Sequence, residues 1–436
     1  MRRHRWLAAC AAVAFAPLAL SGCLFHAAQP AGRTQVVVWS GWVGVEQDAF
    51  ERAVAQFNAS QTRYHLENRT TVEDDTRVFR AITAGTPPDL FFLWRTAYIG
   101  ALAANGAVRP LDGFLAHSQL RERDFVPGAL AQCRYRGHLY AIPFLIDATA
   151  LFWNRDTFAE AGVDPDRPPR TLEELLALAA KLTKRDARGN LVRLGFQPPR
   201  VEEVMALFGG RFSDPASGRI TADDPRNVEA LEWYVRMFEA QGGGLRIDSF
   251  QQGFGEFDSP NHQFFVGKVA MMLSGEWWPS YVTRYSPTTD YGAVAVPYPS
   301  GRPRQKDATF LGGNFAAIPA ESKHPEAAWA FMEWMQSSRA QIAFSKVMHG
   351  LPNVRSALLA PELTRGNRER EVFAEVGRIV ARGNASIFPA TPVNVAYLTE
   401  LETAAQRAVR KAVTPREALA QVQRRLEVYM EPYRGL

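Results

Sequence analysis

The chain is poor in cysteine, with three among 436 residues, at positions 10, 23 and 133. We expect the first to leave with an N-terminal leader and the second to be modified, which leaves Cys133 without a partner for an internal disulfide. This excludes a small disulfide-stapled scaffold. A chain of this length exceeds what one hydrophobic core supports and predicts two or more lobes. We interpret Cys133 as a small buried hydrophobic residue.

Clustered positive charge is also missing. Of the 50 basic residues 7 are lysine, and the set is spread along the chain without the stripe that binds phosphate backbones. The net charge of +5 falls to +2 without Arg2, Arg3 and Arg5, which lie in the expected leader. The sequence has no phosphate loop, nucleophile elbow or pair of histidines four residues apart. These absences disfavour nucleic-acid binding and metal transport, and we expect no cofactor and no enzyme.

The N-terminus carries a targeting signal. A basic segment, residues 1–5, precedes the apolar run Trp6 to Leu20, which is too short to cross a bilayer comfortably and is typical of a signal peptide. The sequence Leu20-Ser21-Gly22-Cys23 resembles the bacterial lipobox, whose cysteine receives acyl chains such as palmitate and becomes the new N-terminus. We therefore predict a signal peptide over 1–22, a lipid anchor on Cys23 and a tether to residue 33, with the body on the extracytoplasmic side of the membrane.

Strands alternate with helices through the body. The apolar runs Val36–Trp39 and Asp89–Leu93 indicate buried strands, and apolar residues at helical spacing predict a helix over Glu46–Asn58. Two capping boxes, Thr171-Leu-Glu-Glu174 and Thr414-Pro-Arg-Glu417, mark the starts of later helices. This order predicts an α/β fold with a parallel sheet and ligand chemistry at the carboxyl ends of its strands.

Several blocks of the sequence form a recognisable series: Gly85–Phe91, Leu139–Phe144, Ala150–Gly162 with the following Pro168–Glu174, Phe265–Met271 with Gly275–Trp278, and Gly312–Asn314 with Lys323–Trp329. In their order and spacing these blocks resemble the extracellular solute-binding proteins of bacterial ABC-type sugar importers, the maltose-binding-protein-like family. The resemblance covers nearly the whole mature chain.

The resemblance implies a periplasmic-binding-protein-like type II fold, in which two discontinuous α/β lobes close on a hinge around the ligand. We place the first lobe at 34–144 plus 297–345 and the second at 145–296 plus 346–436. Such a protein captures a sugar or oligosaccharide and delivers it to the membrane permease. We expect a monomer.

A sugar site combines aromatic side chains, which pack on the C–H face of the ring, with polar groups that pair the hydroxyls. Aromatic and charged residues follow the predicted strands, and the resemblance adds a polar contact after the first crossing and a stacking tryptophan at position 277. We predict ligand contacts from Trp39, Trp42, Glu46, Trp94, Arg95, Asp147, Glu276, Trp277, Trp278, Gly313, Asn314 and Arg355. Trp39 and Trp94 are alternatively core aromatics, and Glu46 alternatively only favours a helix N-terminus.

Two other functions stay open at this point. Asp147 and Glu276 are a carboxylate pair that could serve a secreted glycoside hydrolase as acid and base. The same fold could instead bind a glycerol phosphodiester through Arg95 and Arg355, or a polyamine through its carboxylates. We place neutral sugar first because of the aromatic content.

Overall fold

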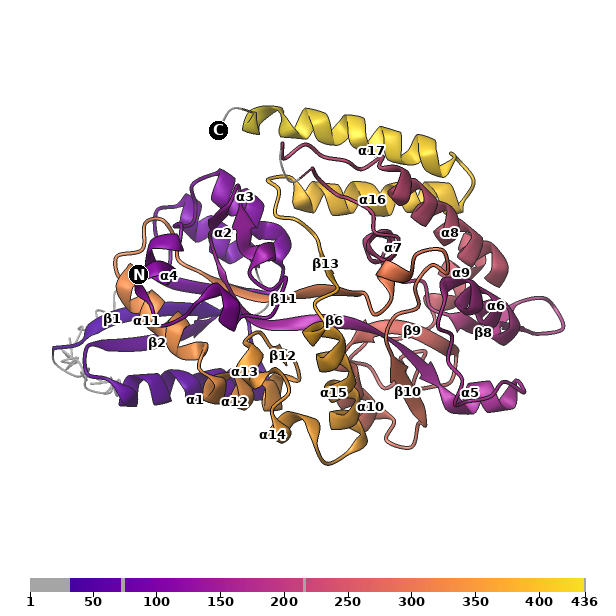
Figure 1. Ribbon diagram of the computed structural model, residues 1–436, viewed down its shortest axis with the longest axis horizontal. Coiled ribbons are helices and arrows are strands. Elements are labelled where there is room, and N and C mark those ends of the chain that lie inside the picture. Colours follow the sequence, from indigo (N-terminus) through magenta and orange to yellow (C-terminus); the bar gives the residue numbers. More distant parts are fainter. Residues whose placement is uncertain (1–31, 72–74, 215–216, 435–436) are drawn as a thin grey trace, which may run out of the picture.

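The computed structural model describes residues 32–71, 75–214 and 217–434, so the predicted signal peptide, Cys23 and most of the tether lie outside the described residues. Two lobes lie side by side along the longest axis, and strands that run through both connect them (Figure 1). No helix in the described ranges is long and apolar enough to span a membrane.

The first lobe is built on three parallel strands in the order β2-β1-β3. The four residues of β3 are all buried, which is why this short apolar run forms a central strand. In α1, five apolar residues at helical spacing pack on the core. The strands are β1 (Thr34–Ser40), β2 (Tyr64–Thr70) and β3 (Leu90–Leu93), and the helices are α1 (Gly44–Ser60), α2 (Asp75–Thr83), α3 (Ile99–Ala104), α4 (Asp112–His117), α11 (Pro325–Met335), α12 (Ser338–Met348) and α13 (Arg355–Leu358).

Two long antiparallel strands, β6 (Ile142–Asn154) and β11 (Thr309–Ala317), run through both lobes and place the first lobe's sheet beside the second lobe's. Every residue of β6 is buried except Asp147, which lies near its middle and pairs with Gly312 of β11. A polar side chain therefore emerges at the point where the chain passes from one lobe to the other.

The second lobe continues the sheet through β9 and β8 to β7, with β10 on the other side of β6. Its strands are β7 (Lys184–Arg185), β8 (Leu191–Phe196), β9 (Val269–Gly275) and β10 (Tyr291–Val294). Its helices are α5 (Arg155–Glu160), α6 (Leu172–Leu182), α7 (Val201–Leu207), α8 (Pro225–Gln241), α9 (Gly244–Gln251), α10 (Trp278–Tyr285), α14 (Pro361–Thr364) and α15 (Arg368–Ala381), followed by α16 (Asn394–Val409) and α17 (Pro415–Met430) along the upper edge in Figure 1.

Each lobe has its own buried cluster of apolar side chains. Ile142 and Phe144 of β6 belong to the cluster of the first lobe, whereas Ile146 belongs to that of the second. Phe310 and Leu311 of β11 pack in the second cluster. The sequence placed residues from 297 onward in the first lobe, but β11 enters that lobe only after Leu311, because its first residues pair with the second-lobe half of β6.

Short pieces complete the connections between the lobes. β12 (Leu351–Pro352) pairs with β6, and β13 (Ala385–Ile387) pairs with the beginning of β11. The two-stranded hairpin of β4 (Arg134–Tyr135) and β5 (His138–Leu139) lies apart from the main sheet.

Candidate functional site

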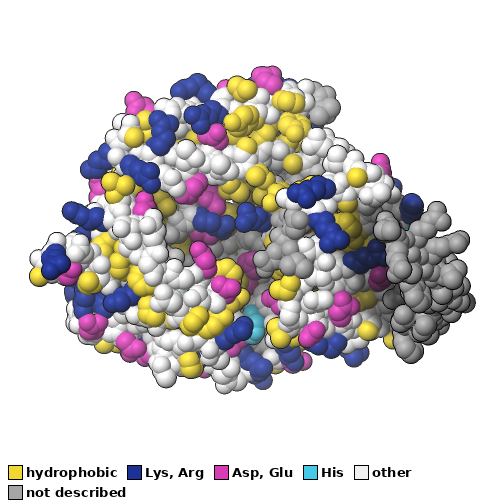
Figure 2. Space-filling view, turned by 180° about the vertical axis from the view of Figure 1, so that it is seen from behind, with side chains coloured by type: hydrophobic (Ala, Val, Ile, Leu, Met, Phe, Trp, Pro, Cys, Tyr) yellow, Lys and Arg dark blue, Asp and Glu magenta, His cyan; other side chains and the backbone are white. Residues whose placement is uncertain are grey.

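The face of the molecule opposite to the view of Figure 1 is hollowed between the two lobes, and acidic and basic side chains gather at the edges of the hollow (Figure 2). The carboxyl ends of β1 and β3 point to this interface from the first lobe, since β3 runs antiparallel to β11, which enters the first lobe from the second, and β1 is parallel to β3. Loops that follow β8 and β9 reach it from the second lobe. A ligand site at strand ends is the arrangement expected for such sheets.

In the first lobe, Trp39 and Trp94 are partly exposed at the ends of β1 and β3. The guanidinium of Arg77 lies 5.1 Å from the centre of the Trp39 ring, within the range of a cation–π contact. Arg95 is exposed, and Glu46 lies partly exposed in the first turn of α1. These four predicted residues are therefore at least partly accessible to solvent.

Trp42 is in a different position, contrary to the prediction that it contacts ligand. Its side chain is 1% exposed and packs in the first-lobe core, with ring centroids 4.6 Å from Phe50, 5.0 Å from Phe92 and 5.2 Å from Phe144. The edge-on contact with Trp94 is 5.7 Å. Trp42 therefore supports Trp94 from the core and presents no surface to a ligand in this conformation.

The neighbouring tryptophans 277 and 278 divide in the same way. Trp278 is fully buried, with its ring stacked on Phe265 at 4.9 Å, so it is a core residue and not the predicted ligand contact. Trp277 is partly exposed. A side chain at position 275 would meet the Trp277 ring, so Gly275 leaves the space in which this ring lies over the end of β9.

Two further aromatic residues, neither of them predicted from the sequence, lie beside Trp277. The rings of Phe257, Trp277 and Tyr281 lie 5.5 to 5.7 Å from one another, all at steep angles, and form what we call the aromatic platform. Phe257 is 48% exposed although it is a large apolar side chain. It follows α9 in a stretch without periodicity. Such a surface is unusual on a soluble protein unless it meets a ligand or partner.

The platform faces a charge from the other lobe. Burial raises the pKa of Tyr281, and after burial the largest contribution comes from the negative charge of Glu46 in the first lobe. Glu46 and Tyr281 are far apart in sequence and come from different lobes. The charge of Glu46 thus acts on Tyr281 across the junction of the lobes.

Asp147 supplies a carboxyl between the two walls. Burial raises its pKa from 3.8 to about 6, and the positive charge of Arg200, in the loop after β8, works against this rise. Sequence reasoning missed Arg200. Its guanidinium also pairs with Glu203 at 2.8 Å and lies over the ring of Phe310.

Glu276 does not present its carboxyl to the interface, contrary to the prediction of a ligand contact. Its side chain is buried and accepts backbone N–H groups from Ala148 and Leu351. Burial, and then the charge of Asp147, raise the pKa of Glu276 well above its ordinary value. Its carboxyl therefore belongs to the junction of the strands.

The remaining predicted residues differ in their surroundings. Gly313 has φ 128°, and a side chain there would collide with the backbone of Leu145, so glycine is required where the register of β11 shifts. Asn314 is partly exposed at this irregularity. Arg355 is exposed at the start of α13. Its Nε donates to the backbone carbonyl of Phe125 at 2.9 Å, so this hydrogen bond does not join it to another predicted site residue.

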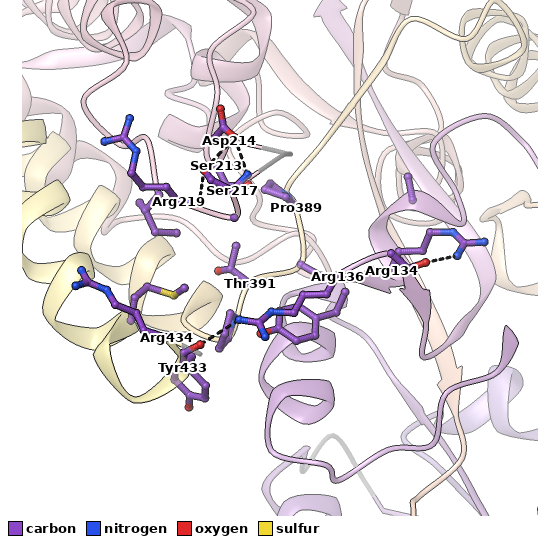
Figure 3. Close-up of a pocket in the computed structure, with 18 of the residues that line it drawn as sticks. Arg134, Arg136, Ser213, Asp214, Ser217, Arg219, Pro389, Thr391, Tyr433 and Arg434 are labelled. Atoms are coloured by element: carbon purple, nitrogen blue, oxygen red, sulfur yellow. Dashed lines mark hydrogen bonds between the residues drawn. The ribbon is translucent and has the colours of Figure 1, made fainter. Parts of the chain in front are cut away.

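A separate cavity has none of the predicted residues in its wall. It measures about 920 Å³ and lies among the β4–β5 hairpin, the loop around Ser213 and the C-terminal segment after α17 (Figure 3). Two of its arginines are engaged: Arg136 reaches across to the carbonyl of Tyr433, while Arg134 points the other way and pairs with Glu122. Over the described ranges, no group of acidic, histidine or cysteine side chains could hold a metal ion.

The fold is that of a two-lobed α/β protein whose lobes are joined by strands of one sheet. The family described as bacterial extracellular solute-binding protein matches residues 52–368, and the chain belongs to this family. This confirms the family predicted from the sequence blocks. Such a protein works on the extracytoplasmic side of the membrane, and its relatives are binding proteins.

Curated relatives are distant in sequence. The chain is 24% identical to the maltotriose-binding protein of Pyrococcus abyssi over 70% of its own length and 63% of the relative's. It is 24% identical to an uncharacterized ABC transporter extracellular-binding protein of Pyrococcus horikoshii, over 90% of each. A mannitol-binding protein of Pseudomonas aeruginosa is 26% identical over 62% of this chain and 59% of the relative.

Solved structures share the fold over nearly the whole chain. The structure of CpMnBP1 with mannotriose bound is 28% identical, with a TM-score of 0.77, and covers 90% of this chain and 99% of that one. A cyclo/maltodextrin-binding protein complexed with maltotetraose is 18% identical, with a TM-score of 0.72 over 92% and 98%. The predicted two-lobed periplasmic-binding-protein fold is thereby confirmed.

Proposed function

We propose that the chain is the substrate-binding lipoprotein of an ABC-type importer, which captures an oligosaccharide between its lobes and delivers it to the membrane permease. The observation that carries this proposal is the partly exposed aromatic platform in one lobe, which interacts with Glu46 of the other lobe. Apolar ring faces pack on the C–H face of a sugar, and Asp147 and Arg200 offer an acceptor and donors for hydroxyls. Relatives named for maltotriose and mannitol, and neighbours with bound mannotriose and maltotetraose, support a carbohydrate ligand.

The proposed mechanism is closure of the two lobes about β6 and β11. Both strands continue through the lobes, and the shift in register at Gly313 offers a point where β11 can bend. Closure would bring the platform onto a sugar held at Trp94 and Asp147, and would exclude water from it. The apparent affinity then depends on how far the closed state is populated without ligand.

Attachment to the membrane is part of the proposal. The lipobox-like sequence before Cys23 supports lipidation after removal of residues 1–22, with the body acting as a monomer. Mass spectrometry of the N-terminal peptide from membrane fractions should find acyl chains on Cys23. Release of Cys23→Ser into the soluble fraction is the matching result, and an unmodified Cys23 would contradict the anchor.

A glycoside hydrolase is not supported by the position of the carboxyls. Glu276 is buried against two backbone N–H groups, so it cannot reach a glycosidic oxygen while Asp147 acts from the interface. Release of reducing ends from an oligosaccharide by the purified protein would contradict the proposal.

A thermal-shift screen tests the proposal directly. Mannotriose, maltotriose, mannitol, glycerol 3-phosphate and spermidine are added separately to the lipid-free chain. A ligand at a hundred times its Kd stabilises the folded state by about 2.7 kcal/mol, which a thermal scan resolves. We expect an oligosaccharide to raise the Tm most. A rise in Tm with glycerol 3-phosphate or spermidine alone would show that the ligand is not a sugar, while leaving the assignment of the fold unchanged.

Binding should weaken as the pH falls below about 6. The Asp147 carboxyl, with its pKa raised to about 6, is ionised above this value and accepts hydroxyls, whereas its protonated form loses an acceptor. Calorimetric titrations between about pH 5 and 8 should show affinity falling up to tenfold per pH unit at the acid end, and Asp147→Asn should bind more weakly with no such trend.

The same group should affect stability with the opposite sign. Its pKa is higher in the folded protein than its ordinary 3.8, so its contribution is fully present below about pH 4 and is lost as the pH rises through 6. Without ligand, Asp147→Asn should therefore lose less stability than the wild type between pH 4 and 7. A wild-type affinity that is flat across pH 6 would contradict the role of Asp147.

A further inference from the structure

Glu276 joins the aromatic platform to the strands that connect the lobes. It follows the last residue of β9 and directly precedes Trp277, and its side chain is 1% exposed. The N–H of Ala148 donates to Oε2 at 2.8 Å, and the N–H of Leu351 donates to Oε1 at 3.2 Å. Both carboxyl oxygens are therefore occupied by backbone donors.

The two donors belong to separate segments that pass between the lobes. Ala148 lies in β6, which contributes side chains to both cores. Leu351 lies in β12 and packs in the second core, whereas Phe344 before it and Val354 after it pack in the first. The side chain of Glu276 thus holds the turn that carries Trp277 against two segments that pass between the lobes, β6 and β12.

We propose that Glu276 is a positioning residue, which holds the turn carrying Trp277 against β6 and β12 and acts on the ligand through Trp277 without contacting it. The inference rests on the proposed function of the interlobe site. Glu276 is the acceptor for two buried backbone N–H groups, and removing it leaves both donors unpaired. Loss of the carboxyl therefore frees the turn from both crossings.

Gly275 makes this tie necessary. With no side chain at 275, the Trp277 ring lies over the strand end, but nothing at that position fixes the direction in which the turn leaves β9. Glu276 supplies that constraint one residue later. The charged groups that face its carboxyl are Asp147 from β6 and, beyond Asp147, Arg200 from the loop after β8.

A double-mutant cycle separates positioning from direct contact. Affinities for mannotriose and maltotriose are measured by calorimetry for the wild type, Glu276→Ala, Trp277→Ala and the double variant. Glu276→Ala should weaken every oligosaccharide that the wild type binds by about tenfold and by a similar factor for each. In the Trp277→Ala background the same change should cost less than about threefold, because coupled residues are not additive.

Glu276→Gln is the conservative control, since it fills the same volume and keeps one acceptor, and it should lose less than Glu276→Ala. Losses that add in the double variant, or a loss confined to one of the two sugars, would overturn the proposal and indicate direct contact.

Hydrogen exchange tests the two hydrogen bonds of Glu276 without any ligand. In the lipid-free full-length chain, Glu276→Ala should speed exchange of the Ala148 and Leu351 amides while β1 and β8 keep wild-type protection. If this variant does not fold, Glu276→Gln should speed at least one of the two amides. Unchanged exchange at both would overturn the inference. If the wild type binds no oligosaccharide, the proposed function is wrong. The exchange result then still tests whether Glu276 holds the turn against β6 and β12.

Discussion

Replacing Trp277 by alanine is expected to weaken oligosaccharide binding about a hundredfold, or roughly 3 kcal/mol, which is the loss typical of a buried aromatic hot spot. The ring is partly exposed, and Phe257, Trp278 and Tyr281 meet it at 65° to 81°, so none of these three stacks on it in parallel. A sugar ring can therefore pack where these neighbours do not. Calorimetry at about pH 7.5 with the best ligand of the screen measures the change.

Two matched variants make this result specific. Phe257→Ala removes the exposed member of the platform and should cost about tenfold, since it leaves Trp277 in place. Tyr429→Ala removes an aromatic ring that is 43% exposed on α17 and should leave affinity unchanged. Full affinity in Trp277→Ala, with its fold intact, would contradict the placement of the ligand on the platform.

Replacing Trp42 by alanine is expected to lower the free energy of unfolding by about 4 kcal/mol, because truncating a buried tryptophan leaves a large cavity. Its ring contacts Phe50, Phe92 and Phe144 in the first-lobe core. Urea unfolding monitored by circular dichroism measures the loss. The remaining folded protein should bind with moderately reduced affinity, since Trp94 loses its support.

Trp42→Phe provides the control. The indole Nε1 of Trp42 is buried without a hydrogen-bond partner, so phenylalanine removes an unpaired donor while it keeps most of the apolar volume, and we expect a loss below about 2 kcal/mol. If Trp42→Ala kept the stability of the wild type but lost binding, the side chain would be a ligand contact after all.

Local features of the fold could be predicted from the sequence. At the second capping box, Thr414 Oγ1 accepts the N–H of Glu417 at 3.2 Å and Glu417 Oε2 accepts the N–H of Thr414 at 3.0 Å, as expected. The predicted helix over Glu46–Asn58 is α1, which extends a residue or two further at each end. Such features depend on neighbours in the chain, and this is why a sequence pattern is enough to find them.

The division of aromatic residues between core and site could not be predicted in the same way. Trp42 and Trp94 both follow strands and look alike in sequence, but only tertiary packing with Phe50, Phe92 and Phe144 buries one of them. Phe257 lies in a loop with no pattern, so its approach to Trp277 became evident only in the structure. The sequence therefore indicated the kind of site but not which aromatic residues are exposed in it.

The carboxyls show the same limit. A lone aspartate within the apolar run of β6 is a visible signal, and Asp147 is the one residue of that strand that is only partly buried. Glu276 is also an acidic residue and stands next to a tryptophan, but its two backbone partners come from 128 and 75 residues away. No local pattern reports such partners, so its burial was not foreseen.

The first core is completed late in the chain. Phe331, Met335 and Phe344 of α11 and α12 pack with residues of β1 and β3 that precede them by more than 200 positions. A growing polypeptide that ends before residue 325 leaves this core open, so its N-terminal half cannot reach a stable state while the rest is being synthesised. The order of the segments therefore delays completion of the first core until most of the chain has been synthesised.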